Sequence, residues 1–179
     1  MKKHIALLLL LVASLLLAGC ESMSVSECKV ADWGRVGFND GTRGEEERRI
    51  AAYTEDCGKA GIVPNAKLYR YGWDQGIVQF CTPANGWREG TEGHASKASV
   101  CQGQAGFAAF SRYLEAGLQV HNTQAQMHRN SSESERLQKR LEESKSDDEK
   151  KDLRADLRQL DRDQVRLRKQ LTEQMLLGP

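Results

Sequence analysis

Apolar residues open the chain in one block, and polar residues follow abruptly. The stretch Ile5–Ala18 is apolar except for one serine, with Lys2 and Lys3 ahead of it and the polar residues ESMS shortly behind. A positive start and a short apolar stretch are typical of a secretory signal peptide. A membrane-spanning helix needs about 20 apolar residues to cross about 30 Å of hydrocarbon. The pattern therefore predicts a signal peptide over 1–19 and no retained span there.

Leucines at heptad spacing mark the other end of the chain. Two sets of positions form a seam with one polar member: Leu153, Leu160 and Leu167, and Leu157, Gln164 and Leu171. Leu137 and Leu141 follow a different register, and Ser146 with Glu149 can cap a new helix. The charged tail, 121–179, is therefore either an antiparallel helical hairpin or a long helix that pairs with another chain through 137–175. The register change and the cap favour the hairpin.

Helical spacing also precedes the tail. Between 104 and 121, apolar residues recur at three- and four-residue intervals, which predicts a helix that continues to about Ser144. A shorter helix ending near Gly58 is expected over 45–59. The stretch 66–81 is interpreted as short strands or irregular turns, from the placement of its few aliphatic residues. The fold class is mainly α: a small domain over 28–120, stapled by disulfides and rich in glycine and aromatic residues, followed by the helical tail.

Aromatic residues and glycines alternate through the domain. Trp33, Trp73 and Trp87 each precede a glycine by three or four residues, which resembles an irregular internal repeat. One interpretation is a binding groove in which the three indoles stack on sugars. The other is that the indoles form the core of a domain poor in leucine and isoleucine. The core interpretation is favoured, because so small a domain needs its largest apolar side chains inside.

Composition narrows the function classes. The 179 residues carry 26 Lys and Arg against 25 Asp and Glu, so there is no overall attraction to nucleic acid. The basic run over 162–169 is interleaved with acidic residues, which is typical of a solvated helix face. No nucleic-acid partner is expected.

Five cysteines are present, and four of them form an even set after Cys20 is set aside. The four are Cys28, Cys57, Cys81 and Cys101. No pair has C-x-x-C spacing and none stands beside a histidine, so two disulfides are favoured over a zinc site, and no metal or cofactor is expected. Spacing alone allows three connectivities. Cys28 with Cys57 and Cys81 with Cys101 are preferred, because each pair brackets one structural unit.

Cys20 stands at the end of Leu17-Ala18-Gly19-Cys20, which resembles the lipobox of bacterial lipoproteins. The resemblance implies acylation of Cys20, cleavage before it and a tether over 20–27. Two or three acyl chains would hold the protein durably on a membrane, whereas one chain anchors only marginally. The residue after the cysteine is Glu21. In Gram-negative lipoproteins an Asp at this position favours retention in the inner membrane. The resemblance therefore implies an outer-membrane location that faces the periplasm.

The wider pattern is similar to a bacterial lipoprotein family known as domain of unknown function 2799. The residues that carry this resemblance are Trp33, Gly37, Asp40-Gly41, Cys57, Tyr71-Gly72, Gly76, Cys81, Gly90, Gly93 and Cys101. It covers roughly 28–117. The family implies a fold unit and a location, and no activity transfers with it.

Catalytic chemistry has no clear candidate in the sequence. His94 with Ser96 or Ser99 is as well explained by ordinary loop hydrogen bonding, so no catalytic residue is assigned and the chain is not expected to be an enzyme. GTRG at 41–44 and GTEG at 90–93 lack the form of a phosphate-binding loop. The leading hypothesis is a lipid-anchored envelope protein that contacts other proteins. The alternative is a peptidoglycan- or glycan-binding module.

Overall fold

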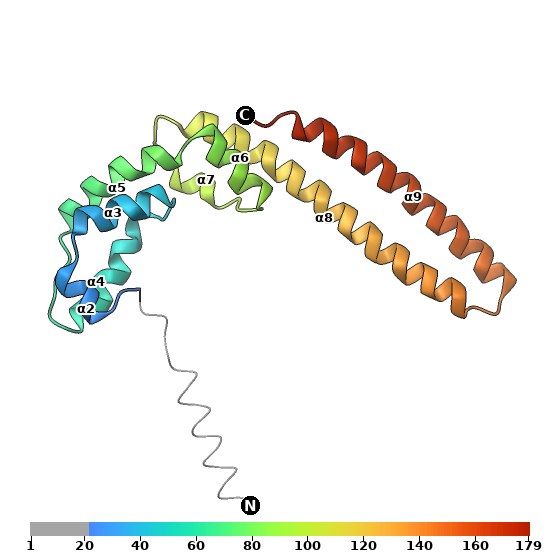
Figure 1. The fold of residues 1–179 in the computed structure, drawn as a ribbon, viewed down its shortest axis with the longest axis horizontal. Helices are drawn as coiled ribbons and strands as arrows, with labels where there is room; N and C mark the ends of the chain where they lie inside the picture. The colour runs from blue at the N-terminus through green and yellow to red at the C-terminus, as the bar shows by residue number, and fades with distance from the viewer. Residues whose placement is uncertain (1–21) are drawn as a thin grey trace, which may run out of the picture.

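The computed structural model describes residues 22–179, and this part of the chain is built from helices without strands. The elements are α2 (Val25–Val30), α3 (Trp33–Thr42), the 3-10 helix η1 (Glu47–Arg49), α4 (Ile50–Gly58), α5 (Ala66–Phe80), α6 (Pro83–Thr91), α7 (Lys97–Val100), α8 (Phe107–Glu143) and α9 (Asp147–Met175). They form an arch, with α2 to α5 at one end and the hairpin of α8 and α9 at the other (Figure 1). None of the helices over 22–179 is long and apolar enough to cross a bilayer.

The mainly helical class is confirmed, but 66–81 forms a helix and not strands or turns. Asn65 caps it by accepting the Leu68 amide. Its inner face consists of residues at intervals of three and one: Tyr69, Gly72, Trp73, Gly76, Ile77 and Phe80. Leu68 and Val78, which suggested strands, are exposed. The helical period was missed because two of its contact positions are glycines.

Glycine allows α3 and α5 to pack with their backbones in contact. A Cβ on Gly37 would lie 1.9 Å from the Tyr69 carbonyl oxygen, and one on Gly72 would lie 1.9 Å from the Gly34 carbonyl oxygen. A side chain at either position would separate the helices. The same type of contact joins α6 to α8, where a Cβ on Gly86 would lie 2.3 Å from the Phe110 carbonyl oxygen.

The two helix pairs are copies of one unit. GFNDGTRG over 37–44 on α3 corresponds to GWREGTEG over 86–93 on α6. A Cβ on Gly76 would meet the Phe38 oxygen and the Thr42 nitrogen, and a Cβ on Gly117 would meet the corresponding atoms of Trp87 and Thr91. We call α2 to α5 the first repeat, and α6, α7 and the start of α8 the second repeat. The glycine pattern is therefore an internal duplication.

Each repeat carries one disulfide. Cys28 pairs with Cys57 and Cys81 pairs with Cys101, so the preferred pairing is confirmed. Each bond joins a cysteine ahead of the first helix of the pair to one in the segment between the two helices. The repeats share one core, in which the Phe80 and Phe110 rings lie 5.5 Å apart. The two disulfides close loops of about 20 to 30 residues, which stabilise by roughly 3 to 4 kcal/mol each in the chain-entropy model.

The tail is an antiparallel hairpin within the chain, as favoured. α8 ends at Glu143, and Ser146 begins α9 by accepting the Glu149 amide. Glu149 does not return to the Ser146 backbone as a full capping box would, and its carboxylate accepts from Ser144 and Arg140 instead. Leu137, Leu153 and Leu167 are buried in the seam.

The middle of the seam is polar. Gln164 Oε1 and Asn130 Nδ2 are buried without a hydrogen-bond partner, beside a cavity of about 180 Å³. Buried polar atoms without partners cost free energy. The centre of the hairpin therefore contributes less stability than an apolar seam of the same length would.

We predict that Gly37→Ala destabilises the protein by about 1 to 3 kcal/mol or more, because the new methyl overlaps the α5 backbone. Thermal or denaturant unfolding measures this loss. Gly58→Ala is the matched control, since nothing lies within 4 Å of its Cβ position in α4. It should be neutral or stabilising by up to about 1 kcal/mol. Equal losses in both variants would contradict the close-packing argument.

We further predict that the double change N130L/Q164L raises the unfolding free energy by about 1 to 3 kcal/mol, because it removes two unpaired buried polar groups. The melting temperature measures the effect. The change V165L, at an exposed position one residue along α9, should leave it nearly unchanged. A lower melting temperature for N130L/Q164L would show that these side chains are satisfied in solution.

Candidate functional site

The duplicated helices each bury one carboxylate at the same place. Asp40 on α3 and Glu89 on α6 both directly precede the second glycine of the shared motif, and both are buried. A buried carboxylate is costly unless hydrogen bonds and opposite charge compensate it. The two repeats compensate their buried carboxylates in different ways, so Asp40 and Glu89 are the most informative polar positions in the described chain.

Asp40 is sealed inside the first repeat. Its Oδ2 accepts from the hydroxyls of Tyr53 and Tyr69 at 3.0 and 2.8 Å, and Arg49 donates to the Tyr53 oxygen at 2.9 Å. Burial, followed by the contact with Asp40, raises the pKa of Tyr69 far above its ordinary value, and burial raises the pKa of Tyr53. Both tyrosines therefore stay neutral donors. This network is structural, since its atoms are occupied by one another.

Glu89 lies instead at the rim of the second repeat. Phe110 occupies the position that corresponds to Tyr69, so the Tyr69 hydroxyl that meets Asp40 has no counterpart in the second repeat. Its oxygens contact Arg88 Nη2 and His94 Nδ1, each at 2.9 Å. Burial raises the pKa of Glu89, but hydrogen bonds from Arg88 and His94 outweigh it and hold the pKa below its ordinary value. Glu89 is therefore a buried anion held by two half-exposed partners.

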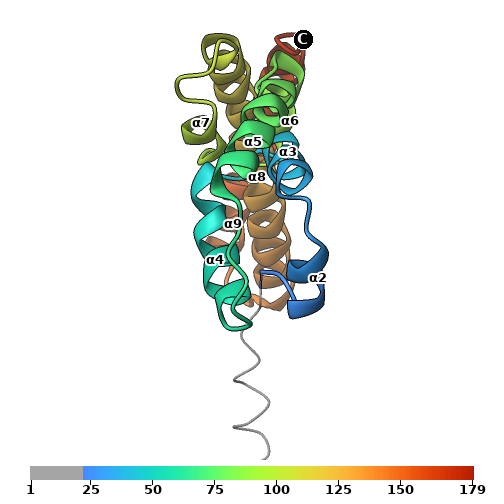
Figure 2. The same cartoon turned by 90° about the vertical axis from the view of Figure 1, so that its left-hand side faces the viewer.

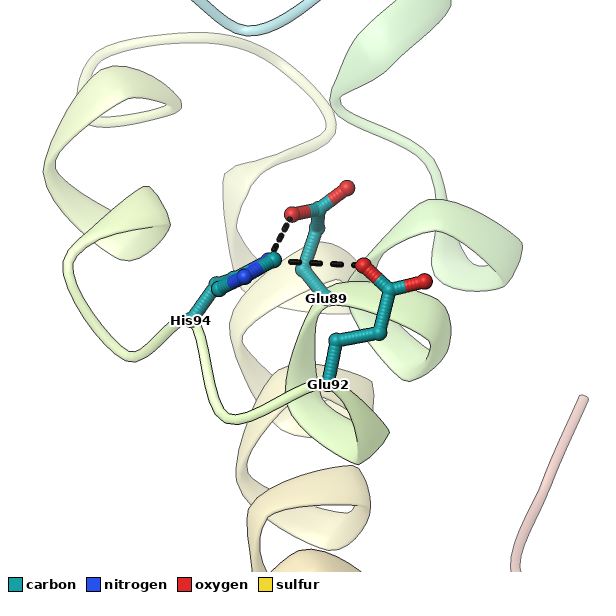
Figure 3. Close-up of side chains that lie close together, drawn as sticks. All are labelled: Glu89, Glu92 and His94. Atoms are coloured by element: carbon teal, nitrogen blue, oxygen red, sulfur yellow. Dashed lines mark hydrogen bonds and ion pairs between the residues drawn. The ribbon is translucent and has the colours of Figure 1, made fainter.

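Glu92 completes the cluster. Its carboxylate lies 3.4 Å from His94 Nδ1, and Figure 3 shows the contacts of the imidazole with both carboxylates. The sequence places them together because α6 ends at Thr91 and the chain turns at Gly93, which has φ of 86°. The turn brings His94 back beside the last turn of α6. We call Glu89, Glu92 and His94 the rim cluster.

The rim cluster contains the donors that a metal ion would need. One atom from each of its three residues lies within 4.8 Å of the others. Imidazole nitrogen and carboxylate oxygen are ligands of Zn²⁺, which prefers four ligands in tetrahedral geometry. In the structure these atoms are hydrogen-bonded to one another, and Arg88 adds a positive charge beside Glu89. The geometry is thus that of an ion-paired cluster, and it is the group of described residues best suited to hold a cation.

A shallow pocket lies between the repeats. It has a volume of about 770 Å³ and is lined by Glu46, Arg48 and Trp73 of the first repeat and by Val100 and Gln102 of the second. Glu46 and Arg48 form an ion pair there. Neither of the buried carboxylates lines it.

The structure divides the three tryptophans between the core and the surface. Trp33 and Trp73 belong to the core, with 8% and 6% of their surface exposed, so the core interpretation holds for both. The Trp73 indole donates to the Glu45 carbonyl oxygen at 2.8 Å. Trp87 is only partly buried, and its ring lies against Gly178 at the returning end of the chain. Two of the three indoles are therefore core residues, and Trp87 is the one that is partly open to solvent.

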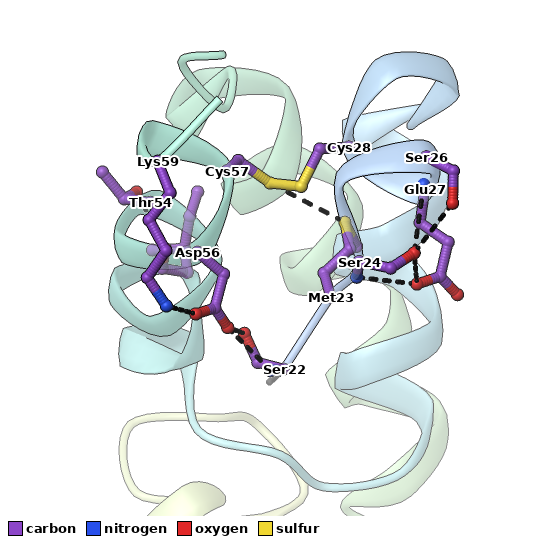
Figure 4. Close-up of a disulfide and its surroundings, with 11 residues drawn as sticks. Ser22, Met23, Ser24, Ser26, Glu27, Cys28, Thr54, Asp56, Cys57 and Lys59 are labelled. Carbon is purple, nitrogen blue, oxygen red and sulfur yellow. Dashed lines mark hydrogen bonds and ion pairs between the residues drawn. A yellow bond between two sulfur atoms is a disulfide. The ribbon is translucent and has the colours of Figure 1, made fainter. Parts of the chain in front are cut away.

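Cys20 and the signal peptide over 1–19 lie outside the described residues. The expected tether over 20–27 is corrected from residue 22 onward, because this segment is attached to the first repeat. The backbone nitrogen and hydroxyl of Ser22 both donate to Asp56 Oδ2 at 2.7 Å (Figure 4). Ser24 then caps α2 through a capping box with Glu27. A polar composition suggested a free linker, but serine and glutamate here serve as a cap.

The rim cluster itself was missed by sequence reasoning. His94 was considered with Ser96 or Ser99, but the Ser99 hydroxyl donates to the Ser96 carbonyl oxygen. A signal was available, since the second copy of the motif, GTEGH, replaces the GTRGE of the first. The alignment of the two copies would have paired Glu89 with Asp40.

The comparisons with known proteins identify a family. Residues 32–119 match the family model described as protein of unknown function (DUF2799). The match begins at Asp32, the N-cap of α3, and ends inside α8, so it covers both glycine-packed helix pairs and excludes most of the hairpin. No curated protein and no solved structure matches the chain.

We predict that Glu89→Gln weakens the protein at pH 7 and reduces its sensitivity to acid. The pKa of Glu89 in the folded chain lies below its ordinary value of 4.5. Its charge therefore stabilises the fold above about pH 4.5, and this contribution is lost as the pH falls through the lower, folded pKa. Unfolding curves between pH 3 and pH 7 measure both effects.

Glu143→Gln at an exposed position is the control for the loss of one charge. It should change stability at pH 7 by no more than about 0.5 kcal/mol. An acid-unfolding profile for Glu89→Gln that is parallel to the wild-type profile would contradict the role assigned to Glu89.

Proposed function

We propose that this chain, which belongs to the family of proteins of unknown function DUF2799, is a lipid-anchored protein of the bacterial cell envelope. In this proposal Cys20 carries the acyl chains, the outer membrane holds them, and the domain faces the periplasm. The apolar run before Cys20 and the LAGC motif support the anchor. Two disulfides agree with an oxidising compartment outside the cytoplasm.

The proposed activity is binding to other proteins through the end of the hairpin. The observation that carries it is the apolar surface after α9, where Met175, Leu176 and Leu177 are all exposed and Leu176 has 81% of its surface open to solvent. Gly178 then meets the partly exposed ring of Trp87. Adjacent exposed apolar groups on a charged helical protein are typical of a protein interaction site. We call residues 175–177 with Trp87 the C-terminal patch.

The seam of the hairpin supports the same proposal. Its leucines are used within the chain, so the surface of the hairpin that other molecules meet is charged along its length and apolar at this end. Self-association through 137–175 is the alternative form of this contact, and it would use the charged faces of α8 and α9.

We predict that Cys20→Ala abolishes acyl labelling and moves the protein from the membrane fraction to the soluble fraction. Acyl chains contribute about 0.8 kcal/mol for each buried methylene, so their loss removes the anchor. Metabolic labelling with a clickable fatty acid and fractionation measure the result. Cys20→Ala protein that still incorporates the label would disprove the lipid attachment at this residue.

We predict that the double change L176S/L177S reduces photo-crosslinking from a probe at the exposed position 173 in intact cells by about tenfold. A few central residues of an interface carry most of its binding energy, and truncating each of them costs more than about 1 kcal/mol. V165S is the matched control, because Val165 is an exposed apolar residue on the same helix but outside the patch. Sedimentation of the purified protein distinguishes self-association. A monomeric protein without crosslinks would refute protein binding.

A further inference from the structure

The anchor and the folded domain are separated by almost no free chain. Ser22 is fixed to Asp56 by two hydrogen bonds, and Lys59 holds the other oxygen of Asp56 at 2.8 Å. These bonds lower the pKa of Asp56 well below its ordinary range, with Lys59 as the largest cause and Ser22 next, so the carboxylate is charged at neutral pH. Next to Ser22, Met23 packs on the disulfide of Cys57 (Figure 4).

Covalent geometry then limits how far the domain can move from its acyl chains. Cys20 and Ser22 are two residues apart in the sequence. Consecutive Cα atoms are about 3.8 Å apart, so the Cα atoms of these residues are at most about 8 Å apart. An acylated Cys20 lies at the membrane interface. The end of the first repeat that holds Ser22 must therefore lie within the thickness of the headgroup layer.

This end of the molecule also exposes apolar side chains. α2 and the end of α4 lie together where the described chain begins, as both views of the fold show (Figures 1 and 2). Val30, at the end of α2, has 80% of its surface exposed, and Val63, in the loop between α4 and α5, has 83%. Val25 at the start of α2 is also exposed. We call Val25, Val30 and Val63 the valine end.

We propose that the valine end rests on the lipid surface that carries the acyl chains and inserts its valines among the headgroups. This inference rests on the proposed lipid anchor and adds an orientation to it. Two independent observations agree: the attachment of Ser22 leaves no room for a distant domain, and α2 and the loop after α4, at the same end of the first repeat, carry exposed apolar residues. Apolar groups at a membrane interface are buried by about 5 to 10 Å.

Electrostatic attraction does not drive the proposed contact between the valine end and the lipid surface. The ion pair of Lys59 with Asp56 neutralises both groups at this end, and α2 carries Glu27 as well as Lys29. The contact should therefore form on zwitterionic lipid and should persist when salt is raised, unlike a contact made by a basic patch. The second repeat and the hairpin lie farther along the arch and remain available to other proteins (Figure 1).

The test uses the full lipidated protein in phosphatidylcholine vesicles with brominated acyl chains, which quench tryptophan fluorescence at close range. The variants are V30W and V63W, and the matched control is V165W, which places an indole at an exposed position on α9. We expect V30W and V63W to be quenched several-fold more than V165W, at both low and high salt. The native indoles are common to all three proteins.

Acyl labelling and flotation with the vesicles are scored separately. Protein that is labelled and floats, but in which V30W and V63W are quenched no more than V165W, overturns the orientation and leaves the anchor in place. Protein that is neither labelled nor bound overturns the anchor and the orientation together. Quenching that disappears at high salt overturns the apolar contact proposed for the valine end.

Discussion

Backbone contact between glycine-lined helices is the constraint on which the rest of the fold depends. In each packed pair the shorter helix, α3 or α6, lies very close to the longer one, α5 or α8. Two glycine positions on each shorter helix leave no space for a side chain. This close packing increases the dispersion contact between the two helices along their length. The disulfides, the buried carboxylates and the turn glycines all take their places from this contact. A small core is sufficient because the helices themselves fill most of the interior.

The two repeats have similar backbones but surround their buried carboxylates with different residues. Each repeat places one acidic side chain beside its glycine contact, and the longer helix of the pair determines whether a buried hydroxyl reaches that carboxylate. In the first repeat Tyr69 supplies a hydroxyl and the site is closed. In the second repeat Phe110 supplies none, and the carboxylate turns to His94 at the surface. The loss of the Tyr69 hydroxyl and the arrival of His94 are two of the differences that separate the internal network of the first repeat from the rim cluster of the second.

Periodic apolar residues predicted the hairpin, because leucines at heptad spacing make most of its seam on α9, and the even set of cysteines predicted the disulfide bonds. The helix over 66–80 was not predictable in the same way, since its period is formed by Gly72 and Gly76 together with aromatic residues. A search for periodic apolar side chains overlooks a helix face that packs through glycines, because glycine has no side chain to count. The rim cluster was hidden for a related reason. Its residues become neighbours through a turn at Gly93, and the repeat was interpreted from the tryptophans, which are not equivalent between the copies.

Helix α8 belongs to the second repeat at its start and to the hairpin for the rest of its length. Its 37 residues span about 55 Å at 1.5 Å each. The start of α8 is held against α6 where Gly90 and Gly117 meet, and the rest of α8 extends beyond this contact. A load on the far end of the hairpin would be resisted at this contact, where the two backbones meet without intervening side chains. The rim cluster lies beside this contact, because Glu89 directly precedes Gly90.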